Sequence, residues 1–215
     1  MKKTNEILIT KANVAIYNGL ENAEIAKRMA PFKYTPERIH QGQLFSENAQ
    51  RLIQKREMEK GEQKAATRLL NEKFVDANLV YMQHVKVGRI ALKNKVGDWD
   101  KLQINGERKE SLSGWVMQAR LFYANLLNNE DLVNQMAKFG ISKKLLKEGQ
   151  QLVEEVEKAY ANQQKEMGEA QDDTKERDAA IDTLNDWYND YIGIARIALA
   201  DKPQLLEIMG IVEPS

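Results

Sequence analysis

The chain has 215 residues, enough for one domain or two small ones, and its 32 basic and 32 acidic residues give a formal net charge of zero. It contains no cysteine, which excludes disulfides, thiolate metal sites and cysteine nucleophiles. Zero net charge removes the general electrostatic argument for nucleic-acid binding, and no apolar run approaches the roughly 20 residues of a membrane span. Because polar residues also interrupt the N-terminal segment where a secretory signal would be apolar, we expect a soluble cytoplasmic protein.

The two halves of the chain carry opposite charge. Residues 1–107 hold 19 basic and 13 acidic residues, a net charge of +6, and residues 108–215 hold 13 and 19, a net charge of −6. Opposite fields favour docking and fix its orientation. We expect the halves to face each other within one bundle; pairing between chains, or a charged partner for one half, is the alternative.

The first half is predicted to be helical. Shorter helices are expected over residues 5–30, followed by a long helical stretch from 35 to 95 in which apolar side chains recur every three or four positions. Thr35 and Pro36 make a good helix start, since threonine caps the first turn and proline suits the first helical position. The polar residues 96–111 are expected to form a connector.

The second half repeats the first. A shift of 107 residues aligns the halves without a gap from Gly42 to Lys95, with 14 identities in 54 positions. We therefore expect shorter helices over 112–138, a helix cap at Ser142 and a second long stretch from 142 to 202.

The predicted fold class is all-α, with a tandem duplication forming an antiparallel bundle that resembles a four-helix bundle. The long helices are expected to pack like a coiled coil. Residues 1–107 are the basic copy and residues 108–215 the acidic copy, packed together as one structural domain with pseudo-two-fold symmetry.

The middle of each long stretch is open to two interpretations. Both middles are polar and contain a glycine at the same place, Gly61 in one and Gly168 in the other. A hairpin turning at each glycine is one possibility, because glycine suits a helix C-terminus. The other is a single long helix through each stretch, since a lone glycine costs only about 1 kcal/mol in a helix.

A short corner precedes each long stretch. Phe32 and Phe139 occupy equivalent places in the two corners, and we expect both to fill the core. The second corner, within residues 132–150, loosely suggests a helix-turn-helix, with a short glycine turn and a serine cap before a basic helix. Its duplicate lacks the glycine and the surrounding half is acidic, so a simple helix–helix corner is the preferred interpretation.

No catalytic or metal-binding pattern stands out. Glu37 and His40 have the Glu-x-x-His spacing of di-iron bundles, but the duplicate offers lysines in their place. There is neither a nucleophile elbow nor a glycine-rich phosphate loop. We therefore assign no catalytic residue, no metal and no cofactor, and an enzyme is less favoured than a binding protein.

One repeated pair of residue types suggests a ligand site. Arg89 and Arg196 occupy equivalent positions near the ends of the two long stretches, and Tyr81 and Tyr188 lie two turns upstream on nearly the same face. An arginine fork can bind a carboxylate or phosphate through two parallel hydrogen bonds. A structural arginine is the preferred explanation, and an anionic small molecule bound beside these four residues is the alternative.

By elimination, the sequence favours a non-catalytic helical interaction or scaffold module with a protein partner or with itself. The leading alternative is a ligand-binding bundle or enzyme with an anionic small molecule near Arg89 and Arg196. A DNA-associated regulator acting through residues 132–150 is the second alternative. Membrane binding is not expected, because the polar faces of the helices carry acidic as well as basic residues.

Overall fold

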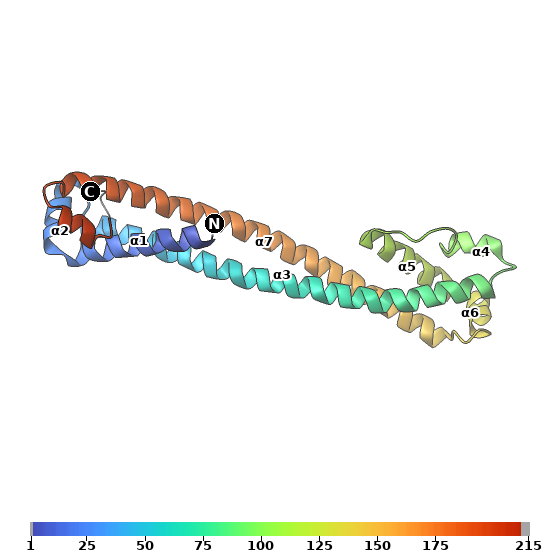
Figure 1. The fold of residues 1–215 in the computed structure, drawn as a ribbon. Coiled ribbons are helices and arrows are strands. Elements are labelled where there is room, and N and C mark those ends of the chain that lie inside the picture. The colour runs from blue at the N-terminus through green and yellow to red at the C-terminus, as the bar shows by residue number, and fades with distance from the viewer. Residues whose placement is uncertain (1, 212–215) are drawn as a thin grey trace. The chain divides into compact units, whose positions relative to one another are not determined.

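The computed structural model describes residues 2–211, and side chains from residue 4 onward; these residues form helices and contain no strand (Figure 1). None of the helices within this range is long and apolar enough to cross a membrane. The all-α prediction is confirmed. In chain order the elements are α1 (Lys2–Glu21), α2 (Ala23–Met29), the 3-10 helix η1 (Ala30–Phe32), α3 (Pro36–Ala91), α4 (Val96–Lys101), α5 (Leu112–Leu127), α6 (Glu130–Ala137), α7 (Lys143–Ala198) and α8 (Pro203–Ile208).

The two long stretches are single helices. α3 and α7 each contain 56 residues and continue through Gly61 and Gly168, so the hairpin interpretation is wrong. The chain divides into two compact units, and both long helices contribute to each. The first unit comprises Met1–Lys60 and Glu169–Ser215, and the second comprises Gly61–Gly168.

Polar caps set where the shorter helices begin. The Asn22 side chain accepts hydrogen bonds from the backbone amides of Glu24 and Ile25, which ends α1 and starts α2 within the expected helical range 5–30. Asn129 caps α6 in the same way. The predicted cap at Ser142 is confirmed, since its Oγ accepts from the amide of Leu145 at 3.3 Å.

The corners before the long helices differ from the expectation. Phe32 and Phe139 are exposed, so the prediction that they fill the core is wrong. A residue with a left-handed backbone follows each phenylalanine, Lys33 at φ 65° and Gly140 at φ 85°. This reversal turns the next side chain, not the phenylalanine, inward. Tyr34 and Ile141 are buried instead, in the cores of the first and second unit respectively.

In the first unit, α3 and α7 run antiparallel and pack around aromatic side chains. The Trp187 and Tyr191 rings stack with centroids 4.9 Å apart. A Cβ added to Gly42 would lie 2.2 Å from the Trp187 ring, so this position of α3 has room only for glycine. Farther along the same pair of helices, Lys55 forms an ion pair with Asp173 at 2.6 Å.

In the second unit, α5 lies against α3 through a cluster of aromatic rings. Tyr81 of α3 makes edge contacts with Trp115 and Phe122 of α5, at centroid distances of 5.7 and 5.5 Å. The indole Nε1 of Trp99 donates to the Leu92 carbonyl at 3.0 Å, which ties the connector to the end of α3. Trp115 is buried in this unit, as Trp187 is in the first.

The start of α7 departs from the three–four spacing of apolar side chains in the sequence. That spacing predicts Leu145 in the core, but Leu145 is exposed and Leu146 is fully buried in its place. Because α7 begins at Lys143, both residues lie in its first turn, where the corner at Gly140 sets the direction of entry.

Ion pairs join the basic half of the chain to the acidic half inside each unit. Besides Lys55 and Asp173 in the first unit, Lys73 pairs with Glu155 at 2.7 Å in the second. In each pair the cation comes from residues 1–107 and the carboxylate from 108–215. In these two pairs the opposite charges of the halves meet within a unit, whereas in the pair of Lys202 and Glu24 the cation comes from the second half and the carboxylate from the first.

Candidate functional site

Arg89 points at the connector that follows its own helix. Its Nε donates to the carbonyl oxygen of Ile104 at 2.9 Å and its Nη2 donates to that of Gly106 at 3.0 Å. Gly106 has a left-handed backbone, with φ of 71°, that a side chain would strain. In this arrangement the guanidinium holds the connector against the end of α3.

Tyr81 lies on α3 two turns before Arg89 and is fully buried. Its hydroxyl accepts a hydrogen bond from Nη1 of Arg108 at 2.9 Å, and Arg108 also donates to the carbonyl of Gln103 at 2.6 Å. Burial raises the pKa of the Tyr81 hydroxyl, and the charge of Arg108 opposes the rise. Two guanidinium groups, those of Arg89 and Arg108, therefore surround one connector and bind its carbonyls.

Arg108 was not singled out from the sequence. It lies in the polar connector between Glu107 and Lys109, and no spacing separates it from the other charged residues there. Its role depends on the left-handed backbone at Gln103 and Gly106, with φ of 56° and 71°, which turns the connector carbonyls toward it. Sequence periodicity carries no signal for such a contact.

The other predicted pair lies in the first unit. Tyr188 is half-buried and Arg196 is exposed. Burial raises the pKa of Tyr188, and the positive charge of Arg196 lowers it, so the two side chains are electrostatic neighbours. The structure thus brings Tyr81 together with Arg89 in one unit and Tyr188 together with Arg196 in the other.

The two histidines have different environments. His84 is buried in the second unit, and its Nδ1 lies 3.0 Å from the hydroxyl of Tyr123. Burial lowers the pKa of His84 and raises that of Tyr123, so both are neutral near pH 7 and the contact is a structural hydrogen bond. His40 is exposed, with its Nδ1 3.2 Å from Oε1 of Gln43.

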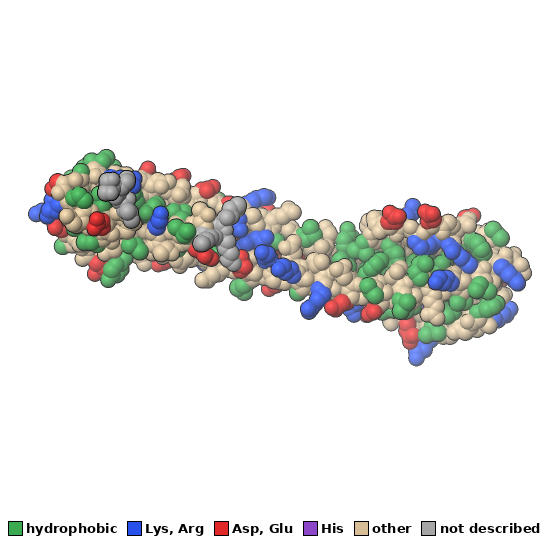
Figure 2. All heavy atoms as spheres, in the orientation of Figure 1, with side chains coloured by type: hydrophobic (Ala, Val, Ile, Leu, Met, Phe, Trp, Pro, Cys, Tyr) green, Lys and Arg blue, Asp and Glu red, His purple; other side chains and the backbone are tan. Residues whose placement is uncertain are grey.

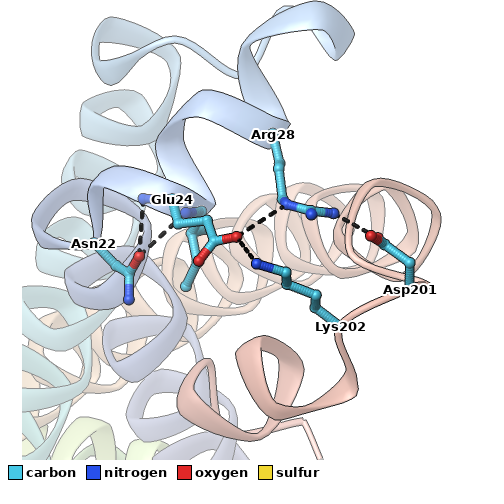
Figure 3. Close-up of polar contacts among 6 residues, drawn as sticks. Asn22, Glu24, Arg28, Asp201 and Lys202 are labelled. Atoms are coloured by element: carbon cyan, nitrogen blue, oxygen red, sulfur yellow. Dashed lines mark hydrogen bonds and ion pairs between the residues drawn. The ribbon is translucent and has the colours of Figure 1, made fainter.

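A network of alternating charges closes one end of the first unit (Figure 3). Arg28 of α2 pairs with Asp201 at 2.5 Å, Glu24 pairs with Lys202, and Arg28 also lies 3.5 Å from Glu24. Hydrogen bonding to Lys202 lowers the pKa of Glu24, and hydrogen bonding to Arg28 lowers that of Asp201. Carboxylates with lowered pKa values are poor proton acceptors near neutral pH. The network therefore joins α2 to the corner between α7 and α8.

Each unit has a groove between a shorter helix and a long one. In the second unit, a groove of about 590 Å³ lies between α5 and α7, and Arg120 crosses it to Glu157 at 3.2 Å. In the first unit, a groove of about 290 Å³ lies between α1 and α3, and the Ser46 hydroxyl donates to Asn13 at 2.6 Å. The larger groove is lined by Arg120, Ala124, Gln150, Val153, Glu154, Glu157, Lys158 and Ala161.

The outer face of α5 borders this groove and exposes two large apolar side chains, Met117 and Leu121, among the polar Ser113, Arg120 and Asn125. Met117 is 67% exposed and Leu121 is 41% exposed. α5 has Arg120 as its single charged residue. Hydrophobic side chains are also visible on the surface of both units in Figure 2. The surface of the second unit therefore offers two neighbouring apolar side chains beside a polar-walled groove.

Neither a protein-family model, nor a curated protein, nor a solved structure matches this chain.

Proposed function

We propose that this protein is a non-catalytic helical interaction module that binds a partner protein through the outer face of α5 and the adjoining α5–α7 groove. The observation that carries the proposal is that α5 exposes two large apolar side chains on the side that faces away from its unit. Trp115 and Phe122 are buried on the inner side, and Met117 and Leu121 are exposed on the outer side, about one turn apart, among the polar Ser113, Arg120 and Asn125. A surface helix of a globular protein normally has a polar outer stripe, and neighbouring large apolar side chains rimmed by polar ones are typical of an interaction surface.

The groove supports a protein partner rather than a small apolar ligand. Its lining includes the apolar side chains of Ala124 and Val153, and the lining residues Arg120 and Glu157 form an ion pair with each other. An exposed pair of this kind contributes little to stability and is easily exchanged for pairs with a partner. A helix laid along α5 would cover the apolar face and exchange polar contacts at the groove wall.

Site-specific photocrosslinking in the native host tests this proposal. A photoreactive phenylalanine analogue at position 117 should give a discrete protein adduct, and Leu121→Asp should abolish it. The matched control places the same analogue at Asp186, an exposed residue of α7. Equal adducts at both positions, or an adduct that survives Leu121→Asp, would argue against a partner on α5.

The proposal includes a tandem duplication, with residues 1–107 and 108–215 as its copies. Supporting it, α3 and α7 are equal in length and begin 107 residues apart, at Pro36 and Lys143. The capping residues Asn22 and Asn129 have the same offset. An experimental structure in which residues 23–101 superpose on 130–208 would test it.

The absence of cysteine fits a reducing compartment, so we place the protein in the cytoplasm.

The two alternatives remain weaker proposals. An anionic ligand near Arg89 and Arg196 would have to compete with the carbonyls that Arg89 already binds. For DNA binding through residues 132–150, Lys143 and Lys144 follow the turn at Gly140, but Lys144 is near Glu148. Salt-dependent retention on heparin would favour DNA, and a phosphate-induced rise in melting temperature that Arg89→Ala removes would favour the anion.

A further inference from the structure

A second apolar surface lies on α3 within the second unit, away from α5. Val75, Leu79 and Ile90 are 63%, 72% and 57% exposed. At 100° per residue, these positions lie opposite Ala77 and Tyr81, which are buried against the rest of the unit. We call this outward strip the α3 seam; it consists of Arg68, Glu72, Val75, Leu79, Gln83, Lys86 and Ile90, all of them exposed.

Exposure to solvent does not by itself explain the apolar side chains of the seam. α7 shows the alternative in the first unit, where the positions 107 residues after Val75 and Leu79 are Asp182 and Asp186, both exposed. Aspartates at these places leave α7 helical. Solvent contact alone therefore gives no reason for valine and leucine on α3, whereas burial against another surface does.

The charged residues of the seam indicate which surface would cover Val75 and Leu79. Glu72 lies two turns before Leu79 and Lys86 lies two turns after it, on the same strip. Glu72 also lies 3.7 Å from Arg68 of its own helix. If a second α3 packed antiparallel about Leu79, Glu72 of each copy would lie opposite Lys86 of the other, and Val75 would lie opposite Gln83. A parallel arrangement would instead place Glu72 against Glu72 and Lys86 against Lys86, which is repulsive.

We propose that the α3 seam is a self-association surface on which a second copy of this chain packs antiparallel, with Leu79 of both copies at the centre, Val75 opposite Gln83, and Glu72–Lys86 ion pairs at both ends. The charged positions are self-complementary, as the common isologous two-fold dimer requires. It is shorter than a standard interface, so the dimer is reversible and weak. This inference rests on the proposed role as an interaction module but uses a different surface and a different partner.

Sedimentation equilibrium of the full chain, over a range on the order of 1 to 300 µM, tests the inference. We expect a reversible monomer–dimer equilibrium. Val75→Asp with Leu79→Asp should raise the dimer dissociation constant by at least about tenfold. The matched control, Met117→Asp with Leu121→Asp, makes the same chemical change on α5 and should leave self-association unchanged. Equal helicity by circular dichroism would show that both variants are folded.

Charge reversal tests the antiparallel direction. Lys86→Glu should weaken the dimer, because it faces Glu72 of the other copy with a second carboxylate. Adding Glu72→Lys to the same chain should restore it, since both end pairs are then re-formed with exchanged signs. A parallel dimer would not be weakened by Lys86→Glu and restored by the double change.

Two results would overturn the inference. One is a monomer at every concentration, which would show that the seam does not bind a second copy. The other is a dimer that survives Val75→Asp with Leu79→Asp, whether or not the α5 variant weakens it. The photocrosslinking result at position 117 does not depend on either outcome, so failure of the seam and failure of the α5 proposal are distinguishable.

Discussion

Two buried tyrosines give opposite predictions for the same substitution. Tyr191 is fully buried in the first unit, and its hydroxyl has no hydrogen-bond partner among the residues that the structure describes. Tyr123 is equally buried in the second unit, but its hydroxyl bonds to His84 at 3.0 Å. A buried polar group without a partner costs about 1–3 kcal/mol. Tyr191→Phe should therefore raise the free energy of unfolding by about 1 kcal/mol, and Tyr123→Phe should lower it by about 1–3 kcal/mol.

Gly19 of α1 provides a second test of the Tyr191 hydroxyl. A Cβ added to Gly19 would lie 1.9 Å from the hydroxyl oxygen of Tyr191 and 3.2 Å from its Cζ. Gly19→Ala should lower the free energy of unfolding. Overpacking costs about 1–3 kcal/mol, and replacing glycine by alanine in a helix offsets only about 1 kcal/mol of that. With Tyr191→Phe present, the oxygen is gone and the ring needs to move only slightly. The two substitutions should then couple by about 1–2 kcal/mol.

Urea unfolding followed by far-UV circular dichroism measures these values for the wild type, the two single variants and the double variant. Tyr123→Phe is the control for losing a tyrosine hydroxyl from a buried site. The reasoning would be refuted if Tyr191→Phe destabilised the protein as much as Tyr123→Phe does. Additive effects of Gly19→Ala and Tyr191→Phe would also refute it, because they would place the two groups out of contact.

Three further predictions follow from the second unit and the long helices. Because burial lowers the pKa of His84 from its ordinary 6.5, the unfolded chain binds a proton at a higher pH than the folded protein, and stability should fall as the pH drops below about 6.5. Thermal melts of His84→Gln between about pH 6.5 and 5 should show a smaller fall, and an unchanged slope would contradict this. Gly61→Ala and Gly168→Ala should each raise the free energy of unfolding by about 1 kcal/mol, since a Cβ there meets nothing within 4 Å, whereas Gly42→Ala should lower it through contact with Trp187. Arg108→Ala should speed amide hydrogen exchange over residues 103–106. Arg108→Lys should not restore protection, because lysine lacks the fork that binds two carbonyls. Unchanged exchange in Arg108→Ala would show that the connector keeps its conformation without this side chain.

Most of the fold was accessible from the sequence because it depends on local rules. The three–four spacing of apolar side chains predicts helices, and the start signals at Thr35–Pro36 and Ser142 predicted the beginnings of α3 and α7. The choice between a long helix and a hairpin at Gly61 was left open. Glycine is compatible with both, and tertiary packing decides between them.

The errors occurred where the backbone leaves the helical region. Lys33 adopts a left-handed conformation that is uncommon for a residue with a side chain, and it exposes Phe32. The buried pair of His84 and Tyr123 joins residues 39 positions apart on different helices. Arg108 likewise acts through a connector whose path is set by Gln103 and Gly106. Neither contact leaves a periodic trace in the sequence.

Residues that recur in both halves mainly stabilise the fold, although their recurrence suggests a functional role. Gly42 and Gly149 admit the Trp187 and Tyr123 rings, and Arg89 binds the backbone of the connector. If the halves arose by duplication, a residue retained in both copies meets a requirement that both copies share, and folding is such a requirement. A specific partner, by contrast, needs to bind only one of the two copies. The positions that differ, such as Val75 and Leu79 against Asp182 and Asp186, are therefore the better guide to binding, which is why the α3 seam carries our inference.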